Sequence, residues 1–193
     1  MTNIKTLAAS VIFSLGAIAS SAASATVITF DDIPSGMIGN GYQGLNWNNM
    51  YVTTPNASNG GYWTGIVSGQ NVAYNSSFQP AYFSSATSFS LQSIEVTKAW
   101  ANGFTRFEGY VGNTLTYQLD VFSTTSGPVH VQFDWNHLNK VIMSDGNQTF
   151  QSAIDNLTIN AATVPEPATG ATMLAGLAMI AFMTRRRSRA QAR

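Results

Sequence analysis

The sequence predicts an all-β fold, a single β-sandwich that lies between an export signal and a C-terminal apolar span. Three observations support this prediction. Short runs rich in Val, Ile, Thr, Tyr and Phe recur along residues 26–163, separated by Gly, Asn, Ser and Pro. No part of this segment has a sustained helical periodicity of apolar residues. Its 138 residues are long enough to form one ordinary hydrophobic core.

The strand-forming runs follow each other about every ten residues, and a turn signal separates each from the next. Gly112 and Asn113 form the clearest turn, because both residue types tolerate the positive φ of a tight hairpin. A core of about nine strands favours a sandwich of jelly-roll type, with an immunoglobulin-like sandwich or a closed barrel as alternatives. The expected strands are Val27–Phe30, Leu45–Val52, Val72–Tyr74, Ser88–Thr97, Thr105–Val111, Thr114–Phe122, Val129–Phe133, His137–Met143 and Ala153–Ile159.

Residues 1–25 have the pattern of a secretory signal peptide. Lys5 supplies the positive charge, and Leu7 to Ala19 form the apolar centre. Small residues at Ala23 and Ala25 then mark a cleavage site. Cleavage after Ala25 leaves Thr26 as the first residue of the mature protein, so we expect the chain to be exported.

The C-terminal tail, residues 164–193, has three parts. An uncharged span at 168–184 is followed by a basic end at 185–193. As a helix, the span is roughly 25 Å long at about 1.5 Å per residue, slightly short of a ~30 Å hydrocarbon layer. Basic residues beside a span stay on the cytoplasmic side. We therefore predict a single transmembrane helix, and a buried core helix is the alternative. The motif before the span is Val164, Pro165, Glu166 and Pro167, and the basic stop is Arg185, Arg186 and Arg187.

This three-part tail, paired with a signal peptide, resembles the PEP-CTERM sorting signal of Gram-negative bacteria. The resemblance implies that an exosortase, a membrane enzyme similar to cysteine proteases, processes the tail. It also implies a precursor held transiently in the inner membrane, with later delivery to the cell envelope or the exopolysaccharide matrix. What the tail predicts is a destination and a processing partner, with no biochemical activity attached.

The segment between the targeting regions is acidic. Residues 26–163 contain three basic and eight acidic side chains, which gives a net charge of −5. Nucleic-acid binding rests on clustered Lys and Arg, so this composition argues against a nucleic-acid partner. Because the chain contains no cysteine, disulfides and thiolate metal sites are excluded, and stability must come from packing.

A second resemblance covers most of the segment from Thr26 to Asn160. Several short motifs in this order are similar to secreted jelly-roll domains found upstream of PEP-CTERM tails, which resemble galactose-binding-like, carbohydrate-binding modules. The resemblance implies a β-sandwich exposed outside the cell. The motifs are Thr29-Phe30-Asp31-Asp32, Gly44-Leu45-Asn46-Trp47, Ala99-Trp100, Gly109-Tyr110 and Ile154-Asp155-Asn156-Leu157.

Acidic side chains near both ends of the domain are candidate calcium ligands. The first and last strands of a jelly roll are commonly neighbours, so Asp31, Asp32 and Asp155 are expected to approach each other. Carboxylate oxygens together with backbone carbonyls suit Ca²⁺, which makes a structural calcium ion possible here. The alternative is that these residues cap turns at strand ends without metal.

Aromatic residues indicate a possible sugar-binding surface. An aromatic face stacks on the apolar face of a pyranose ring, while Asn, Gln and Asp bond its hydroxyls. Tyr62 and Trp63 lie in a Gly-rich loop and are the best candidates for an exposed platform. Trp47 and Trp100 lie among apolar strand residues, so we expect them in the core.

Enzymatic interpretations have weaker support. Glu95 and Glu108 are candidates for a glycosidase pair on neighbouring strands, but each stands near a basic residue, Lys98 or Arg106. Salt-bridged or solvated strand charges explain them more simply. The two histidines, His130 and His137, accompany no hydrolase signature, although a metal site that includes Asp134 stays open.

Two functional hypotheses follow, and neither is enzymatic. The favoured one is an envelope or matrix protein whose sandwich binds polysaccharide or another surface protein. The other is a structural or adhesive module without a defined ligand. A carbohydrate-active enzyme is a weaker third.

Overall fold

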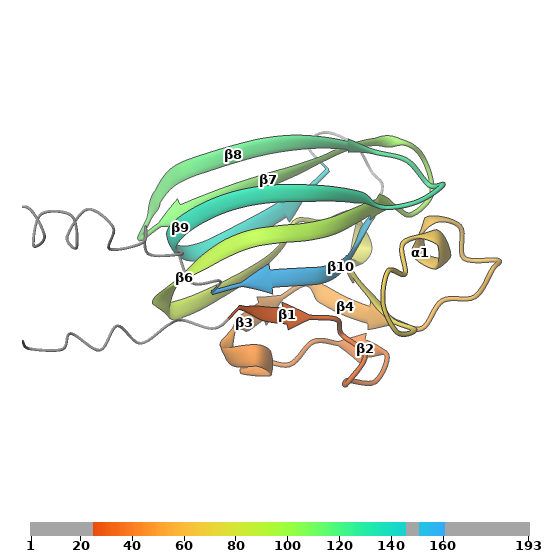
Figure 1. Ribbon diagram of the computed structural model, residues 1–193, viewed down its shortest axis with the longest axis horizontal. Coiled ribbons are helices and arrows are strands. Elements are labelled where there is room, and N and C mark those ends of the chain that lie inside the picture. The colour runs from red at the N-terminus through yellow and green to blue at the C-terminus, as the bar shows by residue number, and fades with distance from the viewer. Residues whose placement is uncertain (1–24, 146–150, 161–193) are drawn as a thin grey trace, which may run out of the picture.

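The computed structural model describes residues 25–145 and 151–160, which form an all-β domain (Figure 1). The predicted fold class is therefore confirmed. The expected signal peptide, apart from Ala25, and the expected sorting tail with its transmembrane helix lie outside these residues. Among the helices that the structure describes, none is long and apolar enough to cross a membrane.

Ten strands build the domain, joined by one α-helical turn and two 3₁₀ turns. The helical turns are η1 (Tyr42–Gly44), α1 (Gly61–Thr64) and η2 (Ser76–Phe78). The strands are β1 (Thr26–Ile28), β2 (Gly36–Met37), β3 (Asn46–Asn48), β4 (Met50–Thr53), β5 (Val72–Asn75), β6 (Ala81–Lys98), β7 (Gly103–Val111), β8 (Thr114–Ser123), β9 (Val129–Ser144) and β10 (Ser152–Ile159).

The two longest strands, β6 and β9, tie the sandwich together. The hydrogen-bonded order is β2-β4-β5-β10-β6-β9-β7-β8, with β1 beside β10 and β3 beside β6. The first half of β6 pairs with β3 and the second half with β10. In β9 only residues 140–144 pair with β7. The register between β6 and β9 shifts around their middles, and each strand thereby passes from one layer to the other.

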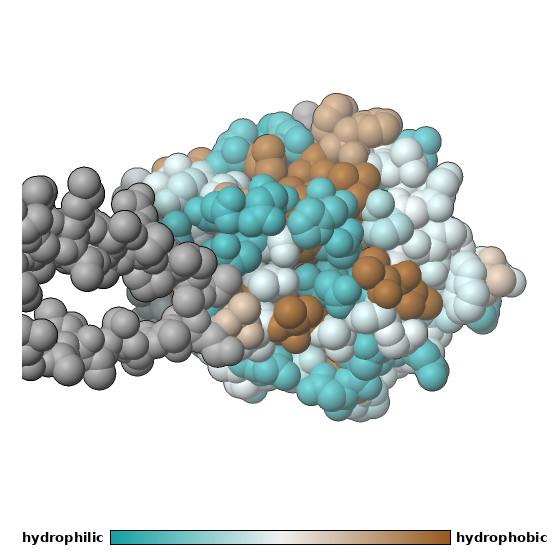
Figure 2. All heavy atoms as spheres, in the orientation of Figure 1, coloured by the Kyte–Doolittle hydropathy of each residue, from teal (hydrophilic) through white to brown (hydrophobic). Residues whose placement is uncertain are grey.

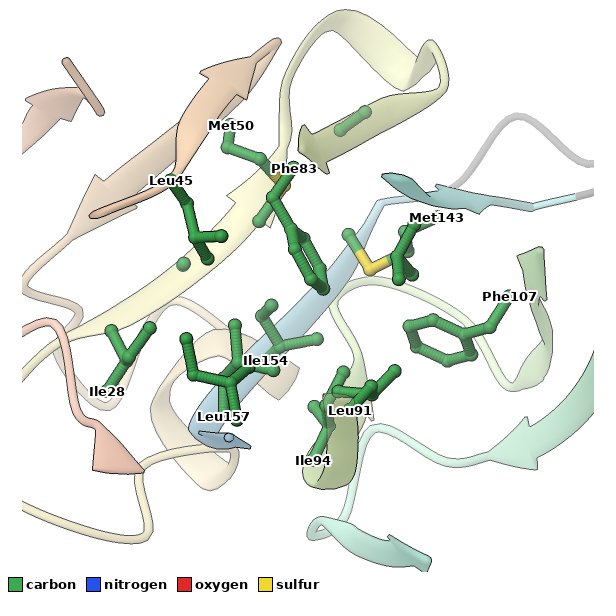
Figure 3. Close-up of a cluster of buried hydrophobic side chains, with 14 of the residues drawn as sticks. Ile28, Leu45, Met50, Phe83, Leu91, Ile94, Phe107, Met143, Ile154 and Leu157 are labelled. Atoms are coloured by element: carbon green, nitrogen blue, oxygen red, sulfur yellow. The ribbon is translucent and has the colours of Figure 1, made fainter. Parts of the chain in front are cut away.

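The core lies between the layers and is filled by side chains from most strands. Alternate residues of β4 and β7 are buried, which is the pattern that a two-layer β fold requires. Figure 3 shows part of this cluster, in which Phe83 and Leu91 of β6 lie near Ile154 of β10. The visible surface in Figure 2 mixes polar side chains with separate apolar patches.

Most predicted strands are confirmed, and the differences have local causes. The hairpin between β7 and β8 turns at Gly112, which has a φ of 60°. Residues 45–52 were expected to form one strand, but Asn49 has a φ of 54° and separates β3 from β4. Two strands were expected across residues 129–143, whereas β9 continues through them and absorbs a bulge at Asp134 and His137.

The first and last strands of the domain are neighbours, as predicted. Thr26 pairs with Ile159 and Ile28 with Leu157, in antiparallel register. The two ends of the described chain therefore lie side by side, and α1 lies at the opposite end of the sandwich (Figure 1). The same separation follows from the register, because α1 bonds to Ala99, just beyond the end of β6 that pairs with Ser152.

Candidate functional site

The short helix α1 carries the candidate platform and is fixed to the end of β6 by glycines. The backbone N–H of Gly61 donates to the carbonyl of Ala99 at 2.9 Å. A Cβ on Gly61 would collide with the Lys98 carbonyl, so only glycine allows this approach. Gly60 precedes it with a φ of 55° and starts the turn. The Gly-rich sequence thus serves close packing of the helix against β6.

The two adjacent aromatic residues on α1 have different environments. Trp63 has 47% of its surface exposed, as the sequence predicted. Tyr62, also expected on the surface, has only 6% exposed, and its hydroxyl donates to Oε1 of Gln151 at 2.5 Å. Burial raises the pKa of Tyr62. The prediction of an exposed pair is therefore wrong for Tyr62, which anchors α1 to the domain.

Trp63 lines the larger of two adjoining hollows on the surface. This cleft has a volume of about 510 Å³ and is lined by Thr54, Pro55, Trp63, Ile66, Gly69 and Gln70. A smaller hollow of about 340 Å³ shares Thr54, Gly69 and Gln70 with it and adds Asp31 and Asn71. The combined depression is apolar near Trp63 and polar near Asp31. It has the size and the mixed lining typical of small-molecule sites.

Asp31 holds the polar side of the cleft in one conformation. Its Oδ1 accepts backbone hydrogen bonds from Gln70 at 2.7 Å and Asn71 at 3.0 Å. Thr54 donates its hydroxyl to the side-chain oxygen of Asn71 at 2.6 Å. Gly69 lies against the Asp31 carboxyl with a φ of 56°, where a side chain has no room. The polar wall is thus organised before any ligand arrives.

Asp155 supports the same loop from inside the domain. This fully buried carboxylate accepts backbone N–H bonds from Val67 at 2.8 Å and Ser68 at 2.9 Å. Burial raises its pKa, its hydrogen bonds oppose the shift, and the nearby charge of Asp31 adds to it. Asp31 and Asp155 therefore converge on the loop of residues 66–71.

Asp32 does not join this pair. Its Oδ1 accepts a hydrogen bond from the Tyr42 hydroxyl at 2.6 Å, and its Oδ2 accepts one from Gln43 at 3.5 Å. Within residues 25–145 and 151–160, no three acidic or histidine side chains form a group that suits a metal ion. The carboxylates hold turns together, as the alternative interpretation proposed. A structural calcium ion at Asp31, Asp32 and Asp155 stays a prediction.

Trp100 was expected in the core, but 52% of its surface is exposed. Its ring packs edge-on against Tyr62, with 5.5 Å between centroids, and its Nε1 donates to Oε1 of Gln151 at 3.3 Å. The side chain is therefore both exposed and fixed in orientation. The sequence signal for the exposure of Trp100 is Asn102-Gly103, which marks a turn just after the strand. Trp47, by contrast, is buried as predicted.

A buried polar cluster lies beneath α1. Lys98 Nζ lies 2.8 Å from Asp145 Oδ1, and the two side chains are 0% and 3% exposed. Ser152 donates to Asp145 at 2.8 Å and contacts Thr105 at 2.6 Å. The cluster joins the ends of four strands at the end of the sandwich that carries α1. It therefore holds together the strand ends against which α1 packs.

The candidate carboxylates for glycosidase chemistry are separated. Glu95 lies on β6 and contacts His130 of β9 at 2.8 Å. Glu108 lies on β7, which is not paired with β6, and accepts a hydrogen bond from Tyr110 at 3.3 Å. Their expected basic partners are engaged elsewhere, since Lys98 pairs with Asp145 and Arg106 with Asp120.

Comparison with known proteins defines the tail most sharply. Residues 163–187 match the PEP-CTERM protein-sorting motif. The match includes the predicted motif at 164–167 and the basic residues at 185–187, so the expected PEP-CTERM tail is confirmed. The motif implies an exported protein that is processed by an exosortase and has a membrane-anchored precursor. A search of curated proteins found no match to the sequence of the chain.

The solved structures that resemble the domain upstream of the PEP-CTERM tail include the following three. The CBM22-1 xylan-binding domain of Paenibacillus barcinonensis Xyn10C has a TM-score of 0.48 at 12% identity, and the alignment covers 76% of this chain and 100% of that one. CBM29_1, a family 29 carbohydrate-binding module from Piromyces equi, has a TM-score of 0.40 at 10% identity, covering 76% and 98%. TmCBM61, solved with β-1,4-galactotriose, has a TM-score of 0.30 at 7% identity, covering 63% and 90%. The resemblance concerns the fold alone.

Proposed function

We propose that this chain is a non-enzymatic polysaccharide-binding protein of the cell envelope or extracellular matrix. One observation carries the proposal, the exposure of Trp63 at the apolar side of a cleft whose other side is polar. A pyranose ring has both an apolar face and a rim of hydroxyls, so it is complementary to such a cleft.

The polar wall supplies the directional contacts. Gln70 and Thr54 line both hollows, and Asp31 and Asn71 line the smaller one. These groups present carboxylate, amide and hydroxyl atoms that bond sugar hydroxyls. Because the loop is already fixed by Asp31 and Asp155, little conformational entropy is lost when a sugar binds.

The sorting motif gives the proposed site its setting. We place the precursor transiently in the inner membrane of a Gram-negative cell, with the domain outside the cytoplasm, until the tail is processed. The acidic domain then resides in the envelope or in its exopolysaccharide. Replacing Pro165, Glu166 and Pro167 by alanine is expected to abolish processing and leave the precursor in the membrane fraction, as an immunoblot would show by its larger mass.

Binding of the full chain to a panel of envelope polysaccharides tests the site. We expect Trp63→Ala to weaken binding at least tenfold, a change of about 1.4 kcal/mol. Phe78→Ala is the matched control, because Phe78 is also an exposed aromatic residue but lies outside both hollows. Equal binding by wild type and Trp63→Ala would move the site elsewhere, and failure to bind any polysaccharide on the panel would refute the function.

A further inference from the structure

Strand β8 forms a long edge of the sheet whose outer side pairs with no strand of the described residues. Along its ten residues it pairs with β7 and with no other strand of the described chain. The opposite end of the sheet is β2, which has two residues, and the side strands β1 and β3 have three each. Short edges limit pairing with other chains, and β8 lacks this protection.

The first part of β9 is a second long stretch that pairs with only one strand, but its hydrogen-bonded ladder is irregular. Its pairing with β6 shifts register, and Asp134 and His137 adopt left-handed conformations. Such bulges twist an edge and hinder the addition of a strand. In contrast, the ladder from Gly103–Ser123 to Gly109–Tyr117 has no register shift. The one shift in this ladder lies between Gly109 and Tyr110, so the backbone of β8 from Tyr117 to Ser123 is a regular edge that another strand can reach.

The side chains of β8 add no chemical protection. The strand contains no Lys, Arg or Pro, the residues that most often block an edge. Its single charge, Asp120, accepts two hydrogen bonds from Arg106 of β7, at 2.7 and 2.8 Å. The charge on the edge is thus neutralised within one chain, which removes the repulsion that would oppose the approach of an identical strand.

Apolar side chains are exposed on both faces of this edge. Leu119 lies on the face of its partner Phe107, whereas Leu115 and Phe122, which pair with Tyr110 and Phe104, lie on the other face. Phe122 packs edge-on against Phe104 of β7, with 5.3 Å between centroids, and both rings remain about half exposed. A strand added beside β8 would therefore bury apolar surface above and below the new hydrogen bonds.

We propose that β8 is the surface through which two copies of this chain associate, strand beside antiparallel strand. A two-fold axis perpendicular to the sheet brings equivalent faces together, so the face that carries Leu119 in one copy continues into the same face of the other. Only a register centred on Asp120 itself would place two aspartates opposite each other. All neighbouring registers oppose Asp120 with a neutral residue of β8, so the strand is compatible with itself.

Cysteine cross-linking on the full chain tests the proposal directly, because the native sequence contains no cysteine. Single variants Thr116→Cys, Gln118→Cys and Leu119→Cys place thiols along the edge. Near a two-fold axis, a thiol lies opposite the same thiol of the second copy. We therefore expect oxidation to give a disulfide-linked dimer for at least one of these positions. Gln132→Cys, on the exposed face of β9, is the matched control and should stay monomeric. Monomers from all three β8 variants would overturn the proposal, as would equal dimer yields from the control.

Sedimentation equilibrium provides a second measurement that does not rely on oxidation. We expect the full chain to form a dimer and Leu119→Lys to shift it toward the monomer by at least tenfold in dissociation constant. Circular dichroism checks that the lysine variant keeps the same unfolding midpoint. A wild-type monomer overturns the proposal, and so does a dimer that the lysine leaves intact, since the contact then lies on another surface. If the chain stays monomeric and a different protein binds along β8, that protein is the partner and the proposal of a second copy is overturned.

Discussion

Two ion pairs between a lysine or arginine and an aspartate in the described residues have similar lengths and opposite surroundings. Lys98 and Asp145 lie 2.8 Å apart with side chains 0% and 3% exposed, beneath α1. Arg106 and Asp120 lie 2.7 Å apart on the surface of β7 and β8, 39% and 40% exposed. In the interior, loss of one partner leaves the other charge buried without a counter-ion. On the surface, water takes the place of the lost partner. Burial, more than distance, decides what each pair contributes.

The largest effect is expected from Lys98→Met. This change leaves the Asp145 carboxylate buried without its cation, which typically costs about 3–5 kcal/mol of unfolding free energy. Urea unfolding of the full chain, followed by tryptophan fluorescence, measures the loss. The double variant Lys98→Met/Asp145→Asn is the control, since it removes both charges and keeps an acceptor for Ser152. It should recover most of the stability, and an equally unstable double variant would contradict the account.

A smaller loss is expected from Gly61→Ala, which disturbs the same end of the sandwich without altering charge. The added methyl group collides with the Lys98 carbonyl and pushes α1 away from β6. Overpacking of this kind costs about 1–3 kcal/mol. We also expect weaker polysaccharide binding, because Trp63 moves with α1. Gly127→Ala is the control, since a methyl group there meets nothing within 4 Å. If both glycine variants unfold alike, the close approach at Gly61 has no energetic role.

Two carboxyl groups, one buried and one exposed, should differ in pKa in opposite directions from the ordinary value. Burial raises the pKa of Asp155 above its ordinary value of 3.8, and the hydrogen bonds from Arg106 lower the pKa of Asp120 below it. Asp155 thus costs stability as pH rises from its unfolded pKa through its folded one. Asp120 contributes stability above its unfolded pKa, and this contribution is lost as pH falls through its folded pKa. Carboxyl NMR titration measures both values, and a reversed order would contradict the assignment.

The smallest effect is expected from Arg106→Gln. The pair is solvent-exposed and screened by salt, so the unfolding midpoint should stay close to that of the wild type. Calorimetry in low and high salt measures the midpoint. Asp120→Asn should behave in the same way. A loss comparable to that of Lys98→Met would show that exposure does not separate the two pairs.

The sequence predicted the positions of the strands better than it predicted which strands and side chains pair with each other. Alternation and turn residues located most strands, since they depend on local chemistry. The continuity of β9 was missed because Asp134 and His137 resemble a strand break, and only pairing with β6 carries the strand across them. The salt-bridge partners of Lys98 and Arg106 were missed for a related reason. Partners far apart in sequence depend on register, which a single chain does not reveal.

The candidate site was predicted in part. Trp63 was recognised because its Gly-rich loop offers few ways to bury an indole ring. The burial of Tyr62 and the exposure of Trp100 were not, since the two side chains contact each other and Gln151, a residue about fifty positions away from Trp100. Asp31 and Asp155 were expected to converge because first and last strands are often adjacent. They do converge, on the loop of residues 66–71.

The pairing of β1 with β10 has a mechanical consequence. A chain held by its C-terminal tail is held at the Ile159 end of β10, while α1 lies near the Ser152 end. Eight residues at about 3.3 Å each separate these points by roughly 25 Å. Anchoring through the tail therefore attaches the domain at the end opposite to the one that carries α1 and Trp63. For the proposed function, this spacing keeps the cleft away from the point of attachment.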